Sequence, residues 1–297
     1  MTEMTPVDPR LKVNGIDIIL PTHGRLDLTI KCLSALYLNT KVPFHLVVVD
    51  DSTPDLDNGT DLTPEYFERF IKKHDNITFI HSDVPYKCGN QFFNEALDKC
   101  EHDYVATVMN SMTVEPEWEL VALNLMENDP KIGIIGFKSL FTFPSTKAGL
   151  IESAGIGFRG HIPIDIGRDL PGHALSNVIT CPAVQWAFAL LRKKAVVGNL
   201  SENTFFGFRG YDDIDNCFVI RHTLVDKDDP SQGTWKVVYC GLGVGYHDSR
   251  ATRGEDSERS LKENRANAIA FCKRWGLWES YKKANNIVDT PKKRRKK

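Results

Sequence analysis

Short apolar runs alternate with amphipathic stretches along the first half of this chain. The runs are Ile16–Leu20, His45–Val49, Thr78–His81, Tyr104–Met109 and Ile132–Phe137. Apolar positions with a helical period fill the intervals, at 26–37, 65–73, 90–100 and 117–127. Repetition of strand and helix predicts an α/β fold with a mostly parallel central sheet flanked by helices.

The second half is richer in glycine and aromatic residues, and its regular patterns are fewer. An apolar segment covers Val184–Leu191, a further run covers Trp235–Cys240, and an amphipathic helix is expected from about Glu258 to Trp275. We therefore divide the chain into an N-terminal extension (1–14), two halves of one domain (15–137 and 138–256), a closing helix (257–288) and a basic disordered tail (289–297).

Composition narrows the class of protein. With 297 residues, 41% of them hydrophobic and 26% charged, the chain can bury a core, and its net charge of -2 gives no global attraction to polyanions. The cations of Lys292–Lys297 either solvate the chain end or recruit an anionic membrane or a nucleic acid.

Seven cysteines without a Cys-x-x-Cys pair indicate reduced thiols. No run approaches the roughly 20 apolar residues of a membrane span, so we expect a cytoplasmic protein, at most peripheral to a membrane.

Polar clusters follow three of the predicted strands at the point where each strand ends. Pro21–Arg25 follows the first strand, Asp50–Ser52 the second, and Asn110–Thr113 the run that begins at Tyr104. Ligands of open α/β sheets bind outside the carboxyl ends of the strands. These clusters therefore predict a ligand site at one edge of the sheet.

A second candidate site is acidic. Asp212, Asp213 and Asp215 crowd together directly after Gly210 and Tyr211. Neighbouring carboxylates repel one another unless they meet a cation, a proton or a hydroxyl donor, so such a cluster suits chemistry. The alternative is an acidic surface turn.

In this order, the clusters resemble those of inverting family 2 glycosyltransferases with the GT-A fold, particularly the rhamnosyltransferase-like branch. The resemblance extends from about Asp17 to Gly276. It implies a glycosyltransferase that moves a hexose or pentose from a UDP-, dTDP- or GDP-sugar to an acceptor hydroxyl with inversion. Residues 15–137 would bind the nucleotide sugar, and 138–256 the acceptor.

The resemblance also assigns roles to single residues. Asp213 would be the general base that deprotonates the acceptor hydroxyl, with Asp212 as the alternative base or as an acceptor ligand, and Asp215 would cap or brace its helix. Trp186 would stack on a sugar, or else fill the core. The expected donor site comprises Pro21, Thr22, Arg25, Asp50, Asp51, Asn94, Asn110, Ser111 and Arg250, and the expected acceptor site comprises Trp186, Gly210 and Tyr211.

One position departs from the family pattern. Relatives place a Mn²⁺ or Mg²⁺ ligand, an aspartate, where this chain has Met112. A thioether is a soft ligand that hard divalent cations avoid. The need for a metal is therefore open: Asn110, His247 or Glu115 could supply ligands, or lysine and arginine could neutralise the diphosphate instead.

Several functions remain open at this point. The acceptor could be a glycan or glycoconjugate, or a modified base in DNA of the kind that some phages glycosylate. A fold relative that binds nucleotide sugars without turnover is the non-enzymatic alternative. A nucleotidyltransferase is disfavoured, because Pro21–Arg25 lacks the glycine-rich phosphate loop with a lysine.

Overall fold

The computed structural model describes residues 13–51, 62–205, 210–248 and 258–287. Most of the predicted N-terminal extension, the basic tail and the candidate donor ligand Arg250 lie outside these ranges. The elements are β1 (Ile16–Thr22), α1 (Leu26–Asn39), β2 (Phe44–Asp51), α2 (Thr63–Phe70), β3 (Ile77–Ser82), α3 (Gly89–Leu97), β4 (Tyr104–Val108), β5 (Met112–Val114), α4 (Trp118–Asn128), β6 (Ile132–Phe141), β7 (Ile151–Ser153), β8 (Ile156–Arg159), β9 (Ile162–Asp165), β10 (Val178–Thr180), β11 (Phe188–Arg192), α5 (Lys193–Val196), α6 (Asp212–His222), a short 3-10 helix (Pro230–Gln232), β12 (Lys236–His247), α7 (Glu258–Arg274) and α8 (Trp278–Ala284).

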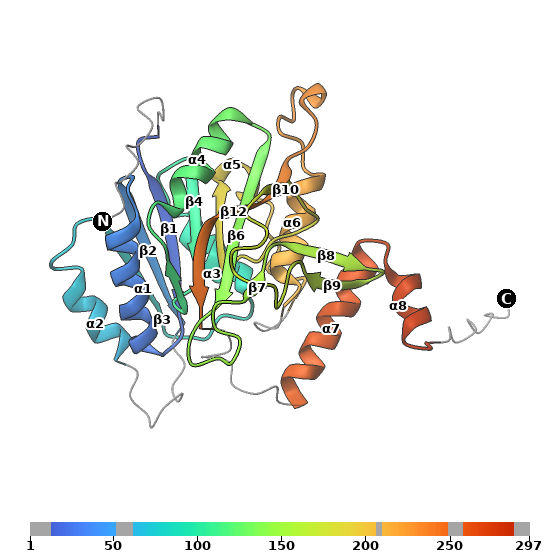
Figure 1. The fold of residues 1–297 in the computed structure, drawn as a ribbon, viewed down its shortest axis with the longest axis horizontal. Helices are drawn as coiled ribbons and strands as arrows, with labels where there is room; N and C mark the ends of the chain where they lie inside the picture. Colours follow the sequence, from blue (N-terminus) through green and yellow to red (C-terminus); the bar gives the residue numbers. More distant parts are fainter. Residues whose placement is uncertain (1–12, 52–61, 206–209, 249–257, 288–297) are drawn as a thin grey trace, which may run out of the picture.

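A ten-stranded mixed sheet forms the centre of the molecule, with helices on both faces (Figure 1). Its main path runs β10-β12-β6-β11-β4-β1-β2-β3. The strands β4, β1, β2 and β3 pair in parallel, as the alternating pattern predicts, whereas β11 is antiparallel to both of its neighbours. The predicted boundary between the halves at 137/138 falls inside β6, so both halves contribute strands to one sheet.

Both faces of the inner strands are apolar. In β2, Leu46 and Val48 pack into one buried cluster, and Val47 and Val49 pack into the other. Successive strand residues point to opposite faces, so a continuous apolar run buries both of them. The double burial of β1 and β2, together with the parallel pairing of β2 with the partly buried β3, holds the carboxyl ends of the three strands in register.

The β8–β9 hairpin lies apart from the main sheet and packs against α6 and α7 through aromatic rings. The ring of Phe158 lies 5.5 Å from that of Phe218 and 6.0 Å from that of Phe271, and the last two are 5.2 Å apart. In Figure 1, α7 and α8 lie at the end of the molecule remote from α1 and α2. The helix expected from about Glu258 to Trp275 is α7, which packs against α6 and the hairpin, and a second helix, α8, follows it within the segment 257–288 that was expected to be a single closing helix.

All seven cysteines are free and buried. Within the ranges that the structure describes, no helix combines the length and apolar character needed to cross a bilayer.

Candidate active site

The ends of β1, β2 and β3 bring three polar side chains into one row. Thr22 pairs in register with Asp50, and Asp50 pairs with His81. Thr22 Oγ1 donates to Asp50 Oδ1 at 2.6 Å, and His81 Nδ1 lies 2.9 Å from Asp50 Oδ2. Because Asp50 is fully buried and both of its oxygens face these donors, it organises the edge of the sheet. Sequence reasoning missed His81, although it is the last polar residue of a predicted strand and could have been found as Thr22 and Asp50 were.

Asp51, the next residue, anchors a second histidine. Its Oδ1 accepts a hydrogen bond from the backbone N–H of Tyr86 at 3.0 Å, and its Oδ2 lies 3.5 Å from Nδ1 of His23. The hydrogen bond to Asp51 raises the pKa of His23 above its ordinary value, against the lowering effect of burial. Positive charge is therefore favoured at the carboxyl end of β1, within the predicted donor site.

The His23–Asp51 pair should make stability depend on pH. The pKa of His23 is raised in the folded state, so the stabilisation is complete below the unfolded value of about 6.5 and is lost as pH rises through the folded value. His23 is 37% exposed, so solvent screening keeps the effect within about 0.5 kcal/mol, or about 1–2 °C. Thermal melts at pH 6 and pH 8.5 should show a larger loss for the wild type than for His23→Gln; equal losses would contradict the coupling.

The turn before α1 gathers two more predicted donor ligands. Arg25 has a left-handed backbone (φ 53°), and its Nε and Nη2 donate to the two carboxylate oxygens of Asp27 at 3.0 and 2.9 Å. Asn110 Nδ2 donates to the carbonyl of Gly24 at 3.3 Å and to Thr29 Oγ1 at 3.1 Å. Both contacts fix the loop that leads into the N-terminus of α1, where backbone N–H groups favour anions.

The remaining predicted donor ligands have different surroundings. Pro21 belongs to β1, and the carbonyl of Ser111 accepts the backbone N–H of Asp248 at 2.9 Å. Asn94 Nδ2 donates to Leu200 O at 3.2 Å and to a carboxylate oxygen of Glu202 at 2.8 Å. Asn94 therefore ties α3 to the segment before α6, and its contact with a nucleotide stays a prediction.

The acidic pair Asp212 and Asp213 opens α6. Tyr211, the preceding residue, has a left-handed backbone (φ 73°), so the chain turns sharply and places both acids in the first helical turn. Asp213 Oδ1 accepts the N–H of Ile214 at 2.8 Å. Asp212 lies against the start of α3: a Cβ added to Gly89 would fall 2.4 Å from Asp212 Oδ2. Glycine at position 89 therefore permits this close approach.

Asp215, the third acid, braces its helix as expected. It is 1% exposed, and its carboxylate accepts hydrogen bonds from Arg274 Nη1 at 2.7 Å and from Trp275 Nε1 at 2.6 Å. Burial raises its pKa, and the hydrogen bond of Trp275 and the charge of Arg274 oppose that rise. Asp215 thus connects α6 to the end of α7.

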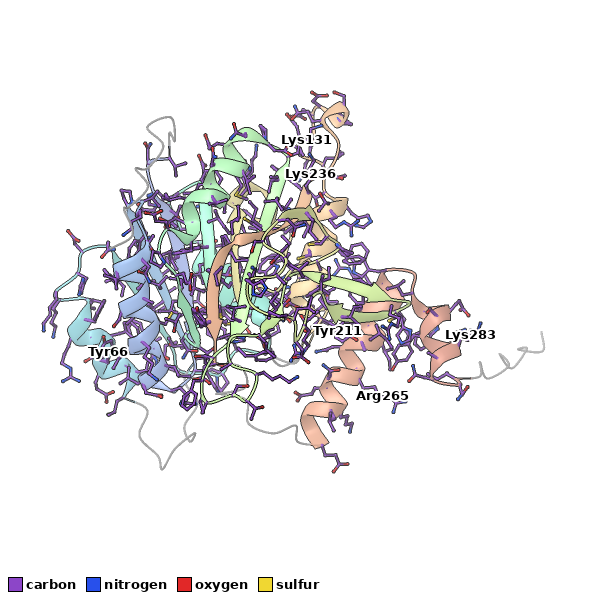
Figure 2. The ribbon with its side chains drawn as sticks, viewed as in Figure 1. Tyr66, Lys131, Tyr211, Lys236, Arg265 and Lys283 are labelled. Atoms are coloured by element: carbon purple, nitrogen blue, oxygen red, sulfur yellow. The ribbon has the colours of Figure 1, made fainter. Side chains whose placement is uncertain are left out.

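A pocket of about 320 Å³ opens beside Asp213. It is bounded by the β8–β9 hairpin, the start of α6 and one side chain of α7; Figure 2 shows Tyr211 beside α7, where its ring lies 5.5 Å from that of Phe271. Its lining residues are Ile156, Ile162, Pro163, Ile164, Asp165, Gln185, Gly210, Tyr211, Asp213, Ile214 and Asn264. The structure thus brings together the predicted Gly210, Tyr211 and Asp213. The structure adds three polar residues that the sequence analysis did not select: Asp165, Gln185 and Asn264. Only Gln185 could have been noticed, as a polar residue inside an apolar run.

Trp186, by contrast, has the surroundings of a core side chain. It is 7% exposed, its ring packs edge-on against Phe93 at 5.0 Å, and its Nε1 donates to Cys217 Sγ at 3.3 Å. Of the two alternatives for Trp186, stacking on a sugar or filling the core, these contacts favour the second.

The residues around Met112 do not fit a divalent-cation site. Met112 is fully buried in β5, opposite His247 of β12, and its Cε would lie 2.8 Å from a Cβ added to Gly245. His247 Nδ1 lies 2.6 Å from a carboxylate oxygen of Glu152, which is itself buried. In the part of the chain that the structure describes, no three His, Cys, Asp or Glu side chains are grouped to hold a metal ion.

Comparisons with known proteins agree with this architecture. Residues 17–147 match the family described as Glycosyl transferase family 2. A comparison with curated protein sequences finds no match. The crystal structure of GalNAc-T7 with UDP, GalNAc and Mn²⁺ is similar at a TM-score of 0.67 and 12% sequence identity, over 91% of this chain and 50% of that chain. The crystal structure of S. aureus TarS 1-349 is similar at a TM-score of 0.50 and 14% identity, over 92% and 78% of the two chains.

At these identities the likeness is one of fold, and it confirms the predicted GT-A-like α/β architecture. This chain spans half the length of the GalNAc-T7 chain that it matches. The rhamnosyltransferase-like branch stays a prediction.

Proposed function

We propose that this chain, whose residues 17–147 match Glycosyl transferase family 2 and whose fold is GT-A-like, transfers a sugar from a nucleotide sugar to an acceptor hydroxyl with inversion. One observation carries the proposal further than the fold does. Asp213, the expected general base, lines an open pocket at the start of α6. A carboxylate at the wall of a pocket can receive the proton of a bound hydroxyl.

The donor is proposed to lie at the carboxyl edge of β1 and β2. Thr22, Asp50 and Asp51 would form its floor, in which Thr22 and His81 are bonded to Asp50, and His23 pairs with Asp51. The N-terminus of α1 and His23 would face the diphosphate, and Arg25 would exchange its two hydrogen bonds to Asp27 for the phosphate oxygens. A UDP-, dTDP- or GDP-sugar fits this scheme, and the GalNAc-T7 structure contains UDP.

The proposed reaction is a single displacement. The acceptor oxygen forms a bond to the anomeric carbon while its proton passes to the carboxylate of Asp213. The bond between that carbon and the diphosphate oxygen breaks, and the nucleoside diphosphate leaves with the electron pair. Attack from the face opposite the leaving group inverts the anomeric centre. Cationic groups near the diphosphate stabilise the leaving charge.

No step is assigned to a metal, because the donor set around Met112 does not fit one. The GalNAc-T7 structure contains Mn²⁺, whereas we propose that this chain needs no metal. Nucleotide binding with and without metal tests this difference. Glycosyl transfer by this chain should then rely on Arg25, His23 and, outside the described residues, Arg250.

Thermal melts with a panel of nucleotides test the donor site. UDP, dTDP and GDP, and their sugars, are added with Mn²⁺, with Mg²⁺ and with a chelator. A ligand at about 100 times its dissociation constant adds about 2.7 kcal/mol, which raises the melting temperature by about 5–10 °C. We expect one nucleotide family to stabilise the protein and to do so in chelator too.

Two results would contradict parts of this proposal. If no nucleotide stabilises the protein in any condition, the donor site is wrong. If stabilisation appears only with Mn²⁺ or Mg²⁺, the residues around Met112 bind a metal after all. Stabilisation without any sugar transfer would instead favour the binding protein that the sequence left open.

A further inference from the structure

The pocket beside Asp213 combines two kinds of lining group. The β8–β9 hairpin contributes aliphatic surface from Ile162, Pro163 and Ile164. Polar atoms come from Asp165 at the end of the same hairpin, and from other elements through Gln185 and Asn264. Ligand pockets that bind selectively have this composition, apolar surface with a few placed polar groups.

The dimensions and chemistry of the pocket suit one sugar ring. Its volume of about 320 Å³ lies at the lower end of the range of ligand pockets, about 300–1,000 Å³. A sugar ring presents C–H surface on its faces and hydroxyl groups at its edge. Each hydroxyl both donates and accepts, whereas a carboxylate only accepts and a side-chain amide does both. Ring and lining are therefore complementary.

Asp165 is held in a defined orientation. Gln185 Nε2 donates to its Oδ1 at 2.9 Å, and Arg168 Nη1 donates to its Oδ2 at 3.0 Å. Burial raises the pKa of Asp165, while a hydrogen bond from Ser153 and the charge of Arg168 oppose that rise. A carboxylate anchored on both oxygens loses little entropy when it receives a further hydrogen bond.

The charge of the pocket disfavours anions. Among the lining residues that the structure describes, Asp165 and Asp213 are acidic, and none is lysine, arginine or histidine. Arg168 pairs with Asp165 and offsets part of its charge, but the guanidinium is not among the lining residues, so a phosphate ester in the pocket would meet carboxylate oxygens directly. A neutral ligand avoids this repulsion.

We propose that this pocket is the acceptor subsite and that it selects a neutral sugar, with Asp165 and Asn264 binding its hydroxyl groups and the hairpin isoleucines covering its face. The inference rests on the proposed function, which supplies the reason for a hydroxyl acceptor next to Asp213. Asp165 is thereby assigned as a residue that determines acceptor specificity.

Saturation-transfer NMR with methyl glycosides tests whether the pocket binds a neutral sugar and whether Asp165 contributes to that binding. The probes are the methyl glycosides of glucose, galactose, mannose, rhamnose and N-acetylglucosamine, together with glucose 6-phosphate and 5-hydroxymethyl-2′-deoxycytidine. The proteins are the wild type, Asp165→Asn, and the control Asp169→Asn. The control makes the same chemical change four residues after Asp165. The carboxylate of Asp169 forms an exposed ion pair with Lys147. Asparagine tolerates the left-handed backbone of this position (φ 69°).

We expect at least one methyl glycoside to bind the wild type and Asp169→Asn, and to bind Asp165→Asn about tenfold more weakly because a charge-assisted hydrogen bond is lost. Glucose 6-phosphate should bind more weakly than the neutral probes. Binding to no glycoside, equal binding of the phosphate, or an unchanged affinity in a folded Asp165→Asn would each overturn the inference. Binding of the hydroxymethyl nucleoside in place of the glycosides would overturn it in favour of a DNA base.

The nucleotide melts keep this test separate from that of the proposed function. Nucleotide stabilisation without glycoside binding would refute the acceptor subsite and leave the transferase proposal intact. Glycoside binding without any nucleotide stabilisation would refute the donor site and leave a sugar-binding pocket.

Discussion

Replacing Asp213 by asparagine should lower the rate of sugar transfer about 10²–10⁴-fold and leave nucleotide binding unchanged. The amide keeps the size of the side chain and can still accept the hydrogen bond of Ile214 N–H, but it cannot take up the acceptor proton. The rate is measured as release of nucleoside diphosphate from the donor that the thermal melts identify. The melts themselves, repeated on the variant, measure nucleotide binding.

Two further variants make the Asp213 result specific. Asp228→Asn makes the same change on an exposed loop and should transfer at the wild-type rate. Asp212→Asn separates the two candidate bases. A large loss in Asp212→Asn with normal turnover in Asp213→Asn would move the role of base to Asp212.

Replacing Asp215 by alanine should lower the free energy of unfolding by about 3–4 kcal/mol. The variant removes a buried carboxylate at the junction of α6 and α7, so Trp275 Nε1 loses its acceptor and Arg274 Nη1 keeps only the longer bond to Thr204 Oγ1, at 3.3 Å. Urea denaturation measures the change, provided that the slope with denaturant is the same in both proteins.

The matched control is Asp129→Ala. Asp129 also pairs with a cation, Lys236, but the two side chains are 34% and 44% exposed. Exposed pairs contribute at most about 1 kcal/mol, so the control should be nearly as stable as the wild type. A similar small loss in Asp215→Ala would show that α7 does not depend on this carboxylate.

Strands of the first half could be predicted because their pattern is local. Each of the five apolar runs became a strand, and Glu258–Trp275 became α7. Short strands such as β8 and β9 escaped prediction, since three or four residues with a mixed pattern carry little periodic signal. The same is true of the antiparallel insertion of β11, whose neighbours in the sheet come from distant parts of the sequence.

The residues of the site likewise fall into those that a local pattern revealed and those that only the tertiary structure revealed. Thr22 and Asp50 could be singled out because each lies at a predicted strand end, and Asp213 because it belongs to an acidic cluster that resembles a motif of the family. Asp165 and Asn264 carry no such pattern, and only the packing of the hairpin and α7 against α6 brings them to Asp213. For Trp186, the residue type alone left sugar stacking and core packing open. Only its burial against Phe93 in the structure favours core packing.

The sequence by itself therefore determined the α/β class, the polar edge of the sheet and the acidic start of α6. These features depend on the period of apolar residues and on a few neighbouring positions. Only the tertiary structure decided what surrounds each of these groups: that Asp50 is enclosed by Thr22 and His81, that Met112 is buried, and that a pocket lies beside Asp213. Burial and contact between residues far apart in the chain arise from the packing of whole elements, which no local pattern encodes.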